Sequence, residues 1–133
     1  MTPENLLYAV THEWVNFETN SQGNCVATVG LSKFALEALT DLVFMELPEE
    51  GRVLAQGDVF GEIESVKAVS EMYAPVAGKV IAVNSAVVDH LESLADDPYE
   101  NGWLVKIEVT DEAGRDSLLD YSAYKKQCES ESH

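Results

Sequence analysis

One lysine stands between two runs with the composition of strands, in the stretch GEIESVKAVSEMYAP, Gly61 to Pro75. Lys67 follows Glu64 by three residues and precedes Glu71 by four, so a hairpin over this stretch carries the lysine at its tip. Most lysines between strands are solvated turn residues. A lysine at the exposed end of a tight turn can also be reached and acylated by another enzyme. The pattern therefore leaves two interpretations, an ordinary turn lysine or a site of acylation.

No motif of an enzyme active site accompanies this lysine. The chain contains no P-loop, GxGxxG, G-x-S-x-G or HExxH motif. His12 and Glu13 are adjacent, and neighbours on a strand point to opposite faces, which does not favour an acid–base pair. Cys25 and Cys128 lack the spacing of a metal site, and we expect two buried or half-buried thiols. The sequence therefore predicts neither catalysis nor a metal centre.

The charge balance restricts the class of partner. The 24 acidic residues outnumber the 8 lysines and arginines and give a formal net charge of −16, which repels nucleic acids and anionic membranes. Protein partners are therefore expected to present basic patches. No window approaches the roughly 20 apolar residues of a membrane span, and the first residues lack the features of a signal peptide. We expect a soluble, monomeric, cytoplasmic protein.

The elements that position Lys67 are predicted to be mostly strands. The 133 residues, of which 46% are hydrophobic, suffice for one core, so we expect a single domain over 1–133 with its core at about 8–109. Alternating apolar residues predict strands at 25–29, 43–47 and 103–109. In the second of these, Val43, Met45 and Leu47 are expected to share the buried face.

Two helices are also predicted. Ser32 has the position of an N-cap for a short helix, with Leu31 and Leu36 placed as a hydrophobic staple. A second helix is expected at about 116–128, with one apolar face made of Leu118, Tyr121, Tyr124 and Cys128. The acidic residues that remain, 129–133, are expected to fray.

Five blocks of sequence stand out, and one of them contains the motif ESVKA, Glu64 to Ala68. They are YAVTHEW (8–14), VGLSKFALEAL (29–39), DLVFMELPEEG (41–51), FGEIESVKAVSEMYAPVAGKVIAVN (60–84) and DPYENGWLVKI (97–107). In order and spacing they resemble the glycine cleavage system H protein family, and ESVKA resembles its lipoyl-lysine motif. The resemblance implies a mainly β fold, a flattened barrel-sandwich hybrid like that of lipoyl and biotinyl carriers, with a short helix in the N-terminal half and a C-terminal helix.

The same resemblance implies a function without catalysis. Lys67 is expected to carry lipoate as an amide, within the lipoylation motif formed by Glu64, Ser65, Val66 and Ala68. The expected partners are glycine decarboxylase (P protein), aminomethyltransferase (T protein) and dihydrolipoamide dehydrogenase (L protein), between which the aminomethyl group of glycine is shuttled. A lipoate ligase or an octanoyl or lipoyl transferase is expected to install the cofactor.

The resemblance further implies a pocket that shields the lipoyl arm, the lipoate attached to Lys67, while it carries the aminomethyl group. Its expected members are Thr11, Glu13 and Glu71, which stand where the family has a hydroxyl residue, a glutamate and an acid four residues after the lysine. The last of these is usually an aspartate in the family. A carboxylate beside a cationic amine that is shielded from water is chemically suited to this role.

Related carriers and departures from the family define the alternatives. Lipoyl domains of 2-oxoacid dehydrogenases typically carry Asp-Lys-Ala at the hairpin tip and biotin carriers carry Met-Lys-Met, whereas this chain has Val66-Lys67-Ala68.

The chain also departs from the family at a few positions, which are Thr40, Ala77, Leu91 and Ala95. The last two lie in the loop 84–98. If this loop docks partner enzymes, an H-like protein that relays or donates lipoate without full glycine cleavage activity is the alternative function.

Overall fold

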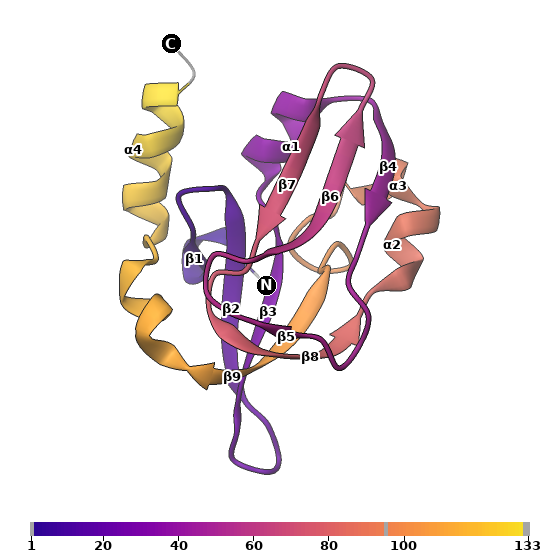
Figure 1. The fold of residues 1–133 in the computed structure, drawn as a ribbon. Helices are drawn as coiled ribbons and strands as arrows, with labels where there is room; N and C mark the ends of the chain where they lie inside the picture. The colour runs from indigo at the N-terminus through magenta and orange to yellow at the C-terminus, as the bar shows by residue number, and fades with distance from the viewer. Residues whose placement is uncertain (1, 95, 132–133) are drawn as a thin grey trace.

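The computed structural model describes residues 2–94 and 96–131, which form two β-sheets and four α-helices (Figure 1). The larger sheet has the order β1-β2-β3-β9-β8-β5 and is antiparallel throughout. Its strands are β1 (Leu7–Tyr8), β2 (Glu13–Thr19), β3 (Cys25–Leu31), β5 (Val53–Leu54), β8 (Ala77–Val83) and β9 (Val105–Asp111). The smaller sheet has the order β4-β6-β7, with β4 (Leu42–Glu46), β6 (Val59–Ser65) and β7 (Val69–Tyr73).

Helices occupy the connections and the C-terminal end. The α-helices are α1 (Lys33–Leu39), α2 (Ser85–Asp89), α3 (Leu91–Leu94) and α4 (Tyr121–Glu131), and the two 3-10 turns are η1 (Pro3–Asn5) and η2 (Glu112–Ser117). Among the described residues, none of the helices has the length and apolar composition needed to cross a membrane. The prediction of a mainly β fold with two sheets and a C-terminal helix is confirmed, and the two sheets do not close into a barrel.

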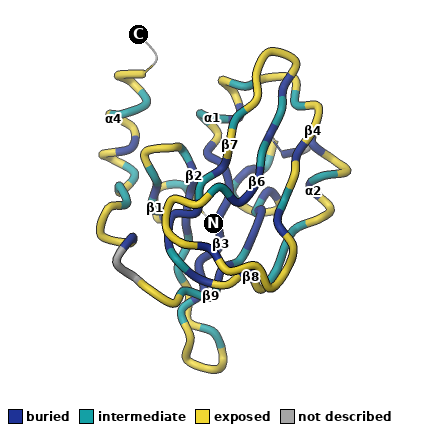
Figure 2. Tube along the Cα trace, in the orientation of Figure 1, coloured by how far each residue is buried: buried dark blue, intermediate teal, exposed yellow. Residues whose placement is uncertain are grey.

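The main core lies between the two sheets. Inward-facing residues of both sheets meet there, among them Ala27, Val29, Met45, Ile63, Met72 and Ile107, each at most 1% exposed. Figure 2 shows this burial along the strands, while the tip of the β6–β7 hairpin remains exposed. Burial of about 25 cal/mol per Å² of apolar surface makes this interface the chief source of stability. The hairpin that carries Lys67 is therefore anchored by its buried face.

A second cluster attaches α4 to the larger sheet. Tyr8, Trp14 and Tyr124 are all at most 3% exposed, and the Tyr8 and Tyr124 rings stack with their centroids 4.3 Å apart. The Trp14 indole donates a hydrogen bond to the carbonyl of Pro98 at 2.9 Å. The stacking fixes the position of α4 beside the loop between β1 and β2.

The short helix begins where the sequence predicts. Ser32 is the N-cap of α1, and its Oγ accepts a hydrogen bond from the backbone N–H of Ala35 at 3.2 Å. Leu31 and Leu36, the expected staple, are both buried in the main core.

The prediction for strand 43–47 is wrong at one residue. The β4 strand pairs with β6, but a bulge between Leu42 and Phe44 interrupts the alternation, so Val43 is 56% exposed while Met45 is buried. A bulge inserts one extra residue and shifts the faces of the strand around it.

The C-terminal helix also differs from the prediction at both ends. Leu119 exchanges backbone hydrogen bonds with Tyr8 at 2.7 and 2.8 Å, which holds the preceding segment extended. Asp120 then caps α4, because its Oδ1 accepts from the N–H of Ala123 at 2.8 Å. The helix continues to Glu131, so residues 129–131 are helical, while 132 and 133 lie outside the described residues, as does Ala95.

Candidate functional site

Lys67 lies at the tip of the β6–β7 hairpin, and its side chain is exposed. Ser65 builds the turn: its N–H donates to the carbonyl of Ala68 at 2.8 Å. Its Oγ accepts from the N–H groups of Lys67 and Ala68 at 3.3 and 3.1 Å. The N–H of Val66 donates to the carbonyl of Asp41 at 3.1 Å, which ties the tip to the loop after α1. The lysine is thus presented on a constrained turn.

The surroundings of Lys67 leave its amine accessible. Val66 and Val69 flank it and are 72% and 60% exposed. Glu64 is half-buried on β6, opposite Val69. Among the described residues, no carboxylate forms an ion pair with the Lys67 ammonium. The motif predicted from the sequence therefore presents an exposed lysine side chain at the tip of the hairpin.

Thr11 and Glu13 are brought together by the loop between β1 and β2. His12, between them, has a φ of +82°, and this left-handed conformation turns both neighbours to one side. The Thr11 hydroxyl donates to Glu13 Oε1. Glu13 Oε2 accepts from the backbone N–H of Tyr73 at 3.0 Å, across to the base of the hairpin. Two of the three predicted pocket residues are therefore in contact.

Glu13 is completely buried, with no exposed surface. Burial raises the pKa of its carboxyl, and the hydrogen bonds from Thr11 and Tyr73 oppose this in part. Because Glu13 has no exposed surface and its Oε1 accepts from Thr11, it acts on its surroundings chiefly through the Thr11 hydroxyl.

Glu71 does not join Thr11 and Glu13. Successive side chains of a strand point to opposite faces. On β7, Met72 points into the core, whereas Glu71 is exposed and pairs in register with Glu62 on the outer face of the smaller sheet. Ser70, on the inward side, takes the position near Thr11 instead.

A cavity of about 200 Å³ lies between the hairpin, α1 and the end of α4, and we name it the α1 cavity. Its lining is largely apolar and comprises Thr11, His12, Leu31, Phe34, Ala35, Ala38, Leu39, Ser70 and Glu131. Ser70 lies three residues after Lys67, or about 10 Å along a strand. In Figure 1 the hairpin tip, α1 and the last turn of α4 lie at the same end of the molecule.

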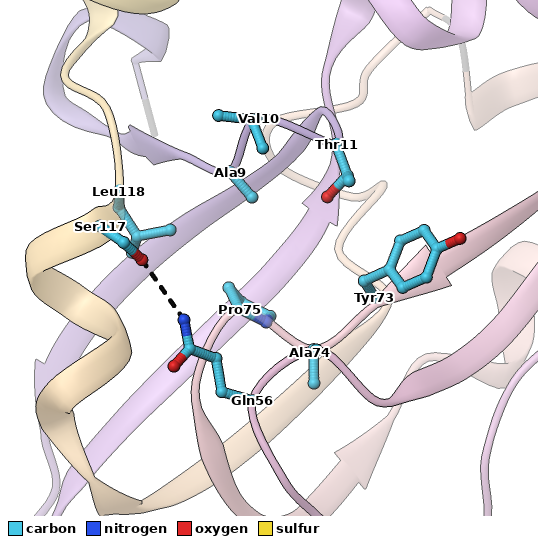
Figure 3. Close-up of a pocket in the computed structure, with 10 residues that line it drawn as sticks. Ala9, Val10, Thr11, Gln56, Tyr73, Ala74, Pro75, Ser117 and Leu118 are labelled. Carbon is cyan, nitrogen blue, oxygen red and sulfur yellow. Dashed lines mark hydrogen bonds between the residues drawn. The ribbon is translucent and has the colours of Figure 1, made fainter.

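A second cavity of about 340 Å³, named here the Tyr73 cavity, lies near the base of the hairpin. Figure 3 shows Thr11 at its rim, with Gln56 and Ser117 on the side away from Tyr73. The Gln56 amide donates to Ser117 Oγ at 3.3 Å. Tyr73 is six residues from Lys67, or about 20 Å along the strand, so the α1 cavity is the nearer of the two.

A polar network that sequence analysis missed joins the walls of the α1 cavity. His12 Nδ1 lies 2.7 Å from the Tyr124 hydroxyl, which lies 2.5 Å from Ser32 Oγ. His12 Nε2 lies 3.0 Å from Glu131 Oε1. His12 therefore pairs with an acid 119 residues away rather than with its neighbour Glu13. No local signal in the sequence indicates this contact.

Comparisons of the sequence and of the structure with known proteins all lead to the same protein family. Residues 6–131 match the model of a protein family described as the glycine cleavage H-protein. The chain is 49% identical over 126 residues to the glycine cleavage system H protein of Rhodopirellula baltica, covering 95% of this chain and 94% of that one. It is 49% identical over 127 residues to that of a Cyanothece species, covering 96% and 95%. The structure resembles the crystal structure of a glycine cleavage system H protein from Mycobacterium marinum, with a TM-score of 0.84, 38% identity and coverage of 95% and 98%.

Proposed function

Because the chain belongs to the glycine cleavage H-protein family, we propose that it is the lipoyl carrier of glycine cleavage, with lipoate attached to Lys67. One observation carries the residue assignment: Lys67 is exposed at the tip of a hairpin whose turn Ser65 constrains. When bound, the lipoyl group supplies a dithiolane that accepts the aminomethyl group of glycine and is afterwards reoxidised. The chain itself presents the attached arm to partner enzymes, shelters its end in a pocket and lets it leave that pocket again.

The hairpin suits recognition by a lipoylating enzyme. Such an enzyme has to reach an amine and to recognise the shape that presents it. Fixed N–H groups at Lys67 and Ala68 keep that shape constant. The exposed valines beside the lysine add apolar surface for an enzyme to cover.

The α1 cavity suits the arm. Leu31, Phe34 and Leu39 give the cavity an apolar lining that favours burial of a dithiolane ring. Ser70, a residue of the hairpin that carries Lys67, also lines the cavity, so the cavity lies next to that hairpin. Thr11 adds a polar atom to this lining. The Thr11 hydroxyl donates its hydrogen bond to Glu13, so its oxygen lone pairs remain free to accept a hydrogen bond from an amine.

Glu13 strengthens that acceptor from behind. Two unit charges about 4 Å apart near a protein surface attract by up to about 4 kcal/mol before desolvation is subtracted. A cation in the cavity also favours the ionised form of Glu13, against the effect of burial. Glu71 remains a predicted member of the pocket, and the test is whether Glu71→Gln changes the release rate of the aminomethyl group. Its exposed position on the outer face of the smaller sheet suits contact with a partner protein better.

The partners follow from the proposed role. We propose that this single-domain carrier meets glycine decarboxylase, aminomethyltransferase and dihydrolipoamide dehydrogenase in turn, as a monomer. With a net charge of −16, association with partners that present basic patches should weaken as salt rises. The names of the relatives described above all refer to glycine cleavage, and none favours the alternative of a lipoate relay.

The test is coexpression with a lipoylating enzyme in the presence of lipoate. Intact mass should increase by one lipoyl group, and peptide mapping should place it on Lys67. The Lys67→Arg variant should fold normally and carry none. Modification at Lys33, Lys79 or Lys106 instead would overturn the assignment. Failure of the lipoylated protein to be loaded by glycine decarboxylase would favour the relay.

A further inference from the structure

Of the described residues that line the α1 cavity, Glu131 alone is acidic. Glu13, the acid expected in the pocket, lies behind Thr11, is fully buried and lines neither of the two cavities described above. The Glu131 side chain is 44% exposed. It is therefore the carboxylate that a group entering the cavity can reach directly.

Glu131 is held in place although it ends a helix. Its Oε1 lies 3.0 Å from His12 Nε2, and its Oε2 accepts from Gln127 Nε2 at 2.7 Å. Gln127 also donates to the carbonyl of Val10 at 2.8 Å, which ties the last turns of α4 to the β1–β2 loop. The hydrogen bonds from Gln127 and His12 lower the pKa of Glu131, so its carboxyl is ionised.

His12 is itself fixed on three sides. The tautomer that uses every contact carries the proton on Nε2, donates it to Glu131 and accepts at Nδ1 from the Tyr124 hydroxyl. Ser32 then donates to Tyr124, and the His12 ring stacks on Phe34 with centroids 5.2 Å apart. Helix α1, the loop and α4 thus determine together where the Glu131 carboxylate points.

The carboxylate retains capacity for a further donor. A carboxylate has about four lone-pair positions, and each Glu131 oxygen uses one with the chain. An ammonium group in the cavity can therefore bond to Glu131 without displacing His12 or Gln127.

We propose that Glu131 is the carboxylate that binds the ammonium of the loaded aminomethyl group in the α1 cavity, with Thr11 as the neutral acceptor beside it. This assignment rests on the carrier function proposed above. The last residue of α4 would then help directly to retain the aminomethyl group, although the sequence predicts that residues 129–133 fray.

The first experiment compares Glu131→Gln with the native protein after lipoylation and loading. Released cargo leaves as formaldehyde and ammonia, since water replaces the carbon–sulfur bond and returns the thiol. Without aminomethyltransferase, release from the variant should be about two- to fivefold faster, the range expected for an exposed ion pair. Glu37→Gln, an exposed glutamate of α1 that does not line the cavity, makes the same charge change and should release at the native rate. Added salt should speed release from the native protein and Glu37→Gln, but not from Glu131→Gln.

A second experiment detects the contact itself. Loading from glycine labelled with carbon-13 at its methylene carbon allows isotope-filtered nuclear Overhauser effects to be measured. Signals should connect this methylene to the Glu131 side-chain methylenes and to the Thr11 methyl. In Glu37→Gln both signals should persist.

The outcomes separate the two proposals. If the native protein is loaded but Glu131→Gln releases at the native rate, or the methylene contacts Thr11 without Glu131, the Glu131 assignment is overturned and the carrier function stands. If the native protein cannot be lipoylated at Lys67 or loaded, both proposals are overturned.

Discussion

Glu13 Oε2 accepts a hydrogen bond from the backbone N–H of Tyr73 at 3.0 Å, although 60 residues separate them. The bond connects the first residue of β2 to the base of the hairpin that presents Lys67. Its acceptor is a fully buried carboxylate whose other oxygen is held by Thr11. These hydrogen bonds therefore hold the hairpin that carries Lys67 in a fixed position relative to Thr11, which lines the α1 cavity.

The position of the lysine within the turn should decide whether it is lipoylated. Exchanging the two residues, with Val66→Lys and Lys67→Val, moves the amine by one position, and successive side chains point to opposite faces. We expect lipoylation to fall sharply, as measured by intact mass at fixed times. Equal rates for the exchanged and native proteins would show that the turn is too flexible for this geometric argument.

Ser65 should be required for the shape of the turn. Ser65→Ala removes the acceptor for the N–H groups of Lys67 and Ala68, at a cost of roughly 1 kcal/mol in unfolding free energy. We expect slower lipoylation at low enzyme concentration and lower protection of these amides in hydrogen exchange. Ser21→Ala, at an exposed turn, is the control and should leave both quantities unchanged.

The buried carboxyl of Glu13 should make stability depend on pH. Because burial raises its pKa, the protonated form favours the folded state. The stabilisation is complete below the ordinary pKa of about 4.5 and is lost as pH rises through the raised value. Relative to Glu13→Gln, the native protein should therefore lose unfolding free energy as pH rises through this window, as measured by urea denaturation. A constant difference between the two proteins across that range would contradict the shift.

Thr11 should contribute to both stability and cargo retention. Thr11→Val leaves Glu13 Oε1 without its donor, which should cost about 1–3 kcal/mol of unfolding free energy. It also removes the neutral acceptor from the α1 cavity, so release of the loaded group should be faster. Thr110→Val, at an exposed strand position, controls for the change of residue type. Unchanged release in Thr11→Val would remove Thr11 from the pocket.

The Tyr124 hydroxyl should stabilise the network around His12. Tyr124→Phe leaves His12 Nδ1 and Ser32 Oγ each without one partner, and we expect a loss of about 1–3 kcal/mol in urea denaturation. Tyr121→Phe makes the same change on the same helix, at a residue that is only half-buried, and should cost less. If the two variants lose equal stability, the Tyr124 hydroxyl and its network contribute no more than the Tyr121 hydroxyl does.

Local patterns in the sequence were sufficient for several elements. Alternating apolar residues identified β3 and most of β9, because the period of a strand determines which side chains reach the core. Ser32 marked the start of α1, since a hydroxyl that caps a helix acts within three residues. The position of Lys67 at the tip of a hairpin was identified in the same way, because the signals of a hairpin are all local.

Other features depend on partners that are distant in the chain. The bulge that exposes Val43 arises in the pairing of β4 with β6. The start of α4 is delayed because Leu119 pairs with Tyr8, and residues before Asp120 cannot join both a bridge and a helix. Neither pairing leaves a mark in the local pattern of apolar residues.

By itself, the sequence determined the family resemblance, the mainly β fold and the lysine at the hairpin tip. The tertiary structure decided which acid lines the α1 cavity: Glu71 lies on the outer face of its sheet, whereas Glu131 comes within 3.0 Å of His12. The physical reason is that a charged side chain carries no periodic signal of its own. Its neighbours are determined by how the buried faces pack, here by the Tyr8–Tyr124 stack that places α4 against the loop.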